Sequence, residues 1–157
     1  MHAHVAQGAL FCTINGLTQA WFHMFEVDAH YASRMGLLAL LMTRLIRLIG
    51  LVLFFVGLAV NHHSDRILRN LRKGPDDTGY YIPRGGLFEV LSAPNLIGEI
   101  IEWWGFALYC QSAVSFGFAL STMAIIGNRA YGHHQWYLKK FPEYAALKRW
   151  SFAPGVM

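Results

Sequence analysis

The chain has 157 residues, of which 55% are hydrophobic and only 14% are charged. An ordinary soluble domain carries about 25% charged residues, so this composition excludes that class and favours a membrane protein. The net charge of +4 comes from Lys and Arg residues clustered beside apolar segments, as the positive-inside rule describes. No basic face with interleaved stacking aromatics lies outside those segments, so a nucleic-acid partner is not predicted.

Four apolar segments follow one another along the chain, at residues 5–25, 37–60, 86–109 and 110–128. Each approaches the ~20 residues that a helix needs to cross the hydrocarbon core. Helices are expected because a spanning segment must satisfy its own backbone hydrogen bonds. The sequence therefore predicts an all-α integral-membrane helix bundle with about four spanning helices, organised as a single membrane domain over residues 1–157.

Two polar stretches, 62–85 and 129–157, lie beside these segments and carry five Lys and Arg residues each. Two predicted spans separate them, so both should lie on the same side of the membrane. Their positive charge predicts that this side is cytosolic. We interpret the first stretch as a loop because Lys73, Gly74, Pro75 and the residues after them are typical of turns.

Asn61, Asp65 and Arg72 form the first group of polar residues that could bind a ligand. On a helix they fall within about 40° of one another, on a face that begins where the longest apolar run ends. An Arg on such a face suits a phosphate, because its guanidinium donates two parallel hydrogen bonds. The alternative is a solvated helix end with an Asp–Arg pair.

Asn95, Glu99 and Glu102 form a second group, which lies inside the third apolar segment. Two acids and an amide are costly in a spanning helix unless they are buried and partnered, so they indicate a functional site. They could bind a nicotinamide carboxamide, a ribose hydroxyl or an Arg from another helix. Pro94, just before them, fits the first turn of a helix or a helix break.

Arg129, His133 and Tyr137 form a third group, spaced four residues apart on one helix face. The adjacent His134 invites a metal interpretation, but two further ligands at a recognisable spacing are missing from the sequence. We therefore predict no metal site. A face that binds a cofactor is the functional interpretation, and a polar interfacial helix is the alternative.

Read in order, these pieces resemble the C-terminal domain of the steroid 5α-reductases, the 3-oxo-5α-steroid 4-dehydrogenases. The resemblance covers roughly residues 45–149. Its motifs are Asn61-His62-His63-Ser64-Asp65 with Leu71-Arg72-Lys73, Thr78-Gly79-Tyr80 through Glu89, Asn95 with Gly98-Glu99-Ile100-Ile101-Glu102-Trp103, and Arg129-Ala130 with His133-His134 and Tyr137-Leu138.

The resemblance implies a helix bundle of the endoplasmic reticulum membrane, with an NADPH pocket that opens to the cytosol. It also implies reduction of the C4=C5 double bond of a 3-oxo-4-ene steroid or a related lipid enone. The residues implied to contact the cofactor are Asn61, Asp65, Arg72, Tyr80, Asn95, Glu99, Arg129, His133 and Tyr137.

Members of the family carry further N-terminal spans, which bring the Glu and Tyr that bind the steroid carbonyl. The sequence holds no counterpart of these two residues, so the catalytic residues stay unassigned. Three alternatives therefore stay open. They are a non-catalytic membrane protein that retains the cofactor fold, a polyprenol or enoyl-CoA reductase of the same superfamily, and a membrane methyltransferase of the isoprenylcysteine type.

Overall fold

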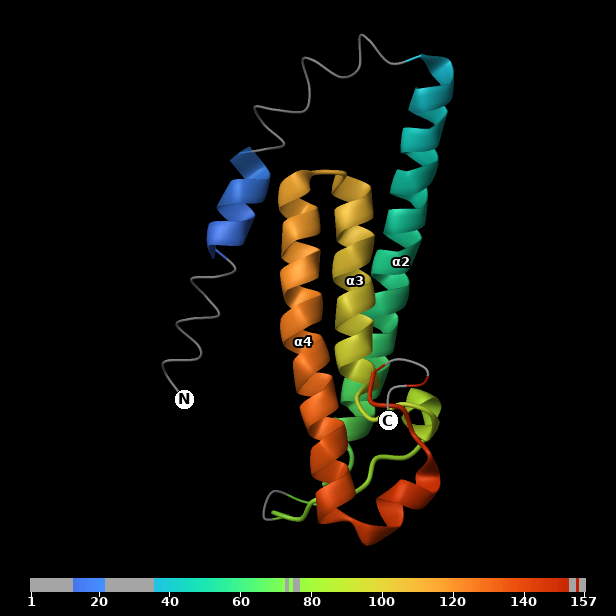
Figure 1. Cartoon of the computed structure of the whole chain (residues 1–157), viewed down its shortest axis with the longest axis vertical. Coiled ribbons are helices and arrows are strands. Elements are labelled where there is room, and N and C mark those ends of the chain that lie inside the picture. The colour runs from blue at the N-terminus through green and yellow to red at the C-terminus, as the bar shows by residue number, and fades with distance from the viewer. Residues whose placement is uncertain (1–12, 22–35, 73, 75–76, 153–154, 156–157) are drawn as a thin grey trace.

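The computed structural model describes residues 13–21, 36–72, 74, 77–152 and 155 (Figure 1). Residues 13–21 are helical, and the described part of the chain contains no strand. This agrees with the predicted all-α class. The elements that follow are α2 (Leu37–Arg69), the 3-10 helix η1 (Gly86–Glu89), α3 (Pro94–Cys110), α4 (Ala113–Lys140) and the 3-10 helix η2 (Pro142–Leu147).

Helix α2 has 33 residues and is therefore about 50 Å long, well beyond the ~30 Å of a bilayer core. Within the described ranges, it is the one helix long and apolar enough to cross a membrane. Its apolar part matches the predicted segment 37–60. The predicted loop 62–85 is wrong at its start, because α2 continues to Arg69. The change from apolar to polar residues at Asn61 marks a change of surroundings, while the helix itself goes on.

Helices α3 and α4 form an antiparallel hairpin, and α3 lies between α2 and α4 (Figure 1). Only two residues join them. Gln111 adopts the left-handed conformation with φ 54°, and Ser112 caps α4 through a reciprocal pair of hydrogen bonds with Ser115. The Gln111 side chain also donates to the Thr43 carbonyl of α2 at 3.1 Å. The tight turn and this bond hold the three helices together at one end.

The boundaries of the third and fourth apolar segments differ from those predicted. The third was expected at 86–109, but η1 takes up its first residues and α3 begins at Pro94, which occupies the first turn as the sequence indicated. The fourth was expected to end at residue 128, but α4 continues to Lys140. Because α3 has only 17 residues, the count of about four spans stays a prediction.

Two pairs of glycines bring α2 and α3 into backbone contact. Gly57 faces Gly98, and Gly50 faces Gly105, seven residues away on each of the two antiparallel helices. A Cβ atom on Gly98 would lie only 2.5 Å from the backbone nitrogen of Asn61. Small residues at such spacing are typical of helix pairs in membranes, where close packing replaces the hydrophobic effect as the source of association.

The apolar surface of α2 is largely exposed, whereas the small buried core lies elsewhere. Large side chains such as Leu48, Val52 and Phe55 each expose about half of their surface. An exposed apolar helix face of this length fits contact with lipid. The buried core joins α3 to α4 through Ala93, Leu96, Ile126 and Ala130.

The C-terminal segment folds back onto the start of α3. After η2, Trp150 pairs with Leu91 in a short parallel bridge, and the two hydrogen bonds around it are each 2.9 Å long. The end of α2, the start of α3 and the end of α4 therefore lie together with residues 77–92 at one end of the bundle (Figure 1).

Candidate functional site

The first two predicted groups of polar residues meet between α2 and α3. The side-chain amide of Asn95 donates to the Asp65 carboxylate at 3.2 Å, and this bond is partly buried. It links α2 with the first turn of α3 across 30 positions of sequence. An amide and a carboxylate held in this way can recognise hydroxyl or amide groups of a ligand, because each keeps unused hydrogen-bonding capacity.

Asn61 and Glu99 lie close to this bond because of the glycine contact between the two helices. Gly98 packs against the backbone of Asn61, and Glu99 follows Gly98 directly in α3. Both Asn61 and Glu99 are half-buried. The structure thus groups four of the nine predicted residues at one helix–helix contact, near the polar end of α2.

Arg72 lies outside the helix on which it was placed. Helix α2 ends at Arg69 and is capped by Asn70, so the helical spacing used to align Arg72 with Asp65 is wrong. The Arg72 side chain is exposed and lies at the same end of the bundle. Its guanidinium is available to an anion there, although not through the helix face that the sequence predicted.

Tyr80 joins this end of the bundle to α4. Its ring lies 5.2 Å from the ring of Trp136 in an edge-to-face arrangement. The Lys140 ammonium lies 5.8 Å from the centre of the Tyr80 ring. Tyr80 nevertheless exposes 64% of its surface, which leaves most of the ring open to a ligand.

The third predicted group lies near the C-terminal end of α4. Arg129 and His133 are exposed and Tyr137 is half-buried. Loss of hydration, and then the positive charge of Arg129, lower the pKa of His133 below its ordinary value of 6.5. Burial raises the pKa of Tyr137. At neutral pH, this face therefore presents a guanidinium, a neutral imidazole and a protonated phenol.

A buried polar cluster that the sequence did not predict lies behind this face. It joins Ser92, His134, Tyr144 and Arg149, all of which are at most 3% exposed. His134 could have been noticed in the sequence, because two adjacent histidines on a helix point in different directions and His134 therefore does not share the face of His133. The others come from three separate segments, and no spacing in the sequence connects them.

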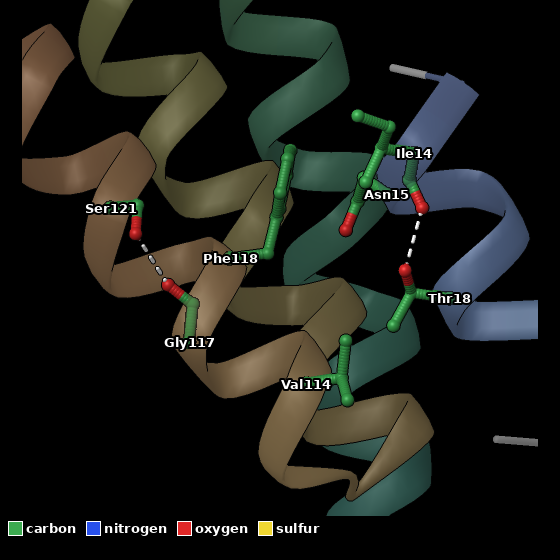
Figure 2. A pocket seen from close by; sticks show the side chains of 7 residues that line it. All are labelled: Ile14, Asn15, Thr18, Val114, Gly117, Phe118 and Ser121. Atoms are coloured by element: carbon green, nitrogen blue, oxygen red, sulfur yellow. Dashed lines mark hydrogen bonds between the residues drawn. The ribbon is translucent and has the colours of Figure 1, made fainter. Parts of the chain in front are cut away.

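A separate hollow of ≈ 200 Å³ lies between the helical stretch 13–21 and the first turns of α4. Figure 2 shows that the hydroxyls of Thr18 and Ser121 point to carbonyl oxygens of their own helices, at 2.7 and 2.9 Å. The wall is consequently mostly apolar. It is lined by Ile14, Asn15, Thr18, Val114, Gly117, Phe118 and Ser121. None of the nine predicted residues belongs to it.

The model of the family described as 3-oxo-5-alpha-steroid 4-dehydrogenase matches residues 2–157. The chain belongs to this family. It is 47% identical to 3-oxo-5-alpha-steroid 4-dehydrogenase 1 of Mus musculus over 141 residues. It is 46% identical to the human type 1 protein over 140 residues and 40% identical to the human type 2 protein over 149 residues.

These alignments cover 89% to 92% of the chain, but only 51% to 54% of each relative. The chain thus spans about half the length of the curated family members that it matches. Identity at this level over nearly the whole chain confirms the resemblance on which the sequence interpretation depended.

Proposed function

We propose that this chain forms the NADPH-binding part of a reductase that acts on the C4=C5 double bond of a 3-oxo-4-ene steroid or a related lipid enone. The observation that carries the proposal is the hydrogen bond between Asp65 and Asn95. It joins two groups of residues that family resemblance assigns to the cofactor, although they are far apart in the sequence.

The chemistry of these residues fits NADPH. Arg72 and Arg129 are exposed guanidinium groups suited to the phosphates of the cofactor. Asn95 and Glu99 offer an amide and a carboxylate, which suit the nicotinamide carboxamide and a ribose hydroxyl. The neutral imidazole of His133 and the phenol of Tyr137 add hydrogen-bond donors without a further formal charge.

In the proposed reaction, bound NADPH would supply a hydride to the β-carbon of the enone. A proton then adds to the α-carbon, so the products are the saturated ketone and NADP⁺. The residues of this chain bind and orient the cofactor, so that the two reacting carbons can approach. The group that polarises the substrate carbonyl stays unassigned. The family points to the endoplasmic reticulum as the compartment.

The test is NADPH binding by the detergent-purified chain, followed by the fluorescence of the bound cofactor. We expect saturable binding that Glu99→Gln and Arg72→Ala each weaken by about tenfold, which corresponds to ~1.4 kcal/mol. Arg69→Ala is the matched control, because it removes the same charge from an exposed position one turn earlier.

Three results would count against this proposal or parts of it. Equal losses for Arg69→Ala and Arg72→Ala would indicate a general charge effect in place of a phosphate contact. Tight NADPH binding without turnover of a 4-ene-3-oxosteroid would favour the non-catalytic alternative. Binding of an adenosylmethionine-type ligand without NADPH binding would favour a methyltransferase instead.

A further inference from the structure

The buried polar cluster behind α4 contains an ordered chain of hydrogen bonds. The Tyr144 hydroxyl donates to Ser92 Oγ at 2.8 Å, and Ser92 Oγ lies 2.6 Å from Nδ1 of His134. The Ser92 hydroxyl has one proton and two acceptor positions, so it can accept from Tyr144 and still either donate to His134 or accept from it. Which ring nitrogen of His134 carries the proton decides the direction of that bond.

The hydrogen-bonded residues Tyr144, Ser92 and His134 contact the face of α4 that carries the predicted cofactor residues. The Tyr144 ring stacks on the Tyr137 ring, with centres 4.9 Å apart and planes inclined by only 13°. His134 precedes Tyr137 by one turn and follows His133 directly in α4. Two of the three hydrogen-bonded residues are therefore connected to the predicted cofactor residues. Tyr144 contacts Tyr137 through ring stacking, and His134 is joined to His133 through the backbone of α4.

Arg149, which is 2% exposed, packs against Tyr144 at one end of these hydrogen-bonded residues. Its guanidinium lies over the Tyr144 ring, 5.5 Å from the ring centre. One nitrogen donates to the Pro83 carbonyl at 3.0 Å, and another lies 3.9 Å from the Glu89 carboxylate. Tyr144 is thus held by its hydroxyl, by the stacked Tyr137 ring and by the Arg149 guanidinium.

We propose that Tyr144, Ser92 and His134 are positioning residues, which hold His133 and Tyr137 in the orientation that binds the cofactor. This inference rests on the proposed function for its ligand, but none of the three side chains was predicted to contact NADPH. Each acts through a neighbour. The C-terminal segment after α4 thereby becomes part of the binding machinery, although it is separate from the residues that family resemblance assigns to it.

The test compares NADPH affinity among variants that break single links. Tyr144→Phe removes the hydroxyl but keeps the stacked ring, and Ser92→Ala removes the central hydroxyl. We expect each to weaken NADPH binding by about tenfold. His134→Leu should have the same effect. His134→Asn should restore most of the affinity, because the Asn amide can either accept from Ser92 or donate to it in place of Nδ1.

A control at the opposite end of α4 separates positioning from general stability. Ser115 is fully buried and caps α4 together with Ser112, so Ser115→Ala should lower the melting temperature without changing NADPH affinity. Hydrogen exchange of the amides at 133–140 gives a readout that needs no cofactor. It should be faster in Tyr144→Phe than in Ser115→Ala.

Three results would overturn the inference, and they are distinguishable. If wild type binds NADPH and Tyr144→Phe binds as tightly, the inference fails and the proposed function stands. If His134→Asn is as impaired as His134→Leu, the hydrogen bond between His134 and Ser92 has no role and the inference fails. If wild type binds no NADPH, the proposed function fails and the positioning role fails with it.

Discussion

His133 and Arg129 interact electrostatically on the candidate face. The lowered pKa of His133 has two causes, of which loss of hydration is the larger and the Arg129 charge is the smaller. A neutral imidazole can donate from one nitrogen and accept at the other. The guanidinium therefore has a second effect besides any contact with phosphate, because it adds to the effect of burial in lowering the pKa of His133.

Removing the charge of Arg129 tests this coupling. In Arg129→Gln, we expect the pKa of His133 to rise toward, but not reach, its ordinary value of 6.5, because the loss of hydration remains. The measurement is an NMR titration of the histidine ring protons. Lys139→Gln, which removes an exposed charge more than one turn away, is the control. An unchanged pKa in Arg129→Gln would contradict the pairing.

The same pKa gives the sign of a pH effect on stability. The folded state binds the His133 proton more weakly than the unfolded chain, because its pKa is lowered on folding. His133 therefore costs no stability well above pH 6.5, and its contribution falls as the pH drops below that value toward the folded pKa. In His133→Gln, the free energy of unfolding should decline less between pH 7 and pH 5 than in wild type. A steeper decline in the variant would contradict this sign.

At the scale of elements, the close pairing of α2 and α3 depends on glycine. A Cβ on Gly98 would meet the Asn61 nitrogen at 2.5 Å and the Gly57 carbonyl oxygen at 2.7 Å. Both neighbours are backbone atoms, so neither can move aside without moving its helix. The hydrogen bond between Asp65 and Asn95 crosses the same contact, one turn nearer the polar end.

Gly98→Ala should therefore force the two helices apart. We expect it to lower the free energy of unfolding by about 1–3 kcal/mol, as overpacking of a tight contact does, and to weaken NADPH binding as well. Thermal unfolding in detergent measures the first effect. Gly127→Ala in α4 is the control, because no atom lies within 4 Å of its Cβ position. It should be neutral or slightly stabilising.

Much of this arrangement could be predicted from the sequence. The length of the apolar runs predicted the helical class, and one of the two interpretations of Pro94 placed it in the first turn of a helix. Gly50 and Gly57 lie seven residues apart, and so do Gly98 and Gly105, so the pairing of these two glycine faces could also have been predicted. Helix ends were predicted less well, because the sequence signal at Asn61 and at residue 128 marks polarity, and a helix continues through a change of polarity.

The candidate site was only partly predictable, for a physical reason. Asp65 and Asn95 each stood out as polar residues beside or within apolar helices, because burial makes such residues costly. Ser92, Tyr144 and Arg149 lie in irregular or 3-10 segments. In such segments, no helical or strand repeat predicts which surface a side chain packs against. Their role depends on how the C-terminal segment folds back, which only the three-dimensional structure reveals.

At the scale of the whole molecule, the nine predicted residues lie in the second halves of α2 and α4, in the first turns of α3 and in the segment between α2 and η1. These parts meet at one end of the bundle, whereas the apolar part of α2 extends toward the other end (Figure 1). The last turn of α2 carries Arg66 and Arg69, and the last turn of α4 carries Lys139 and Lys140. Both groups complement the helix dipoles at these C-terminal ends. Both groups lie at the same end of the bundle, which the positive-inside rule predicts to be the cytosolic end.

This arrangement predicts the topology of the chain in a sealed vesicle. Single cysteines at Thr78 and Glu143, both exposed, should react with a membrane-impermeant maleimide from the same side, and that side should be the cytosolic one. In a sealed vesicle whose cytosolic side faces outward, a cysteine at Gly36, before the start of α2, should react only after the vesicle is opened. The background is the double variant Cys12→Ser and Cys110→Ser.

Labelling of Thr78→Cys and Glu143→Cys from opposite sides would contradict the bundle, because it would require an odd number of crossings between α2 and the end of α4. Labelling of all three from outside would instead show that α2 does not cross the bilayer.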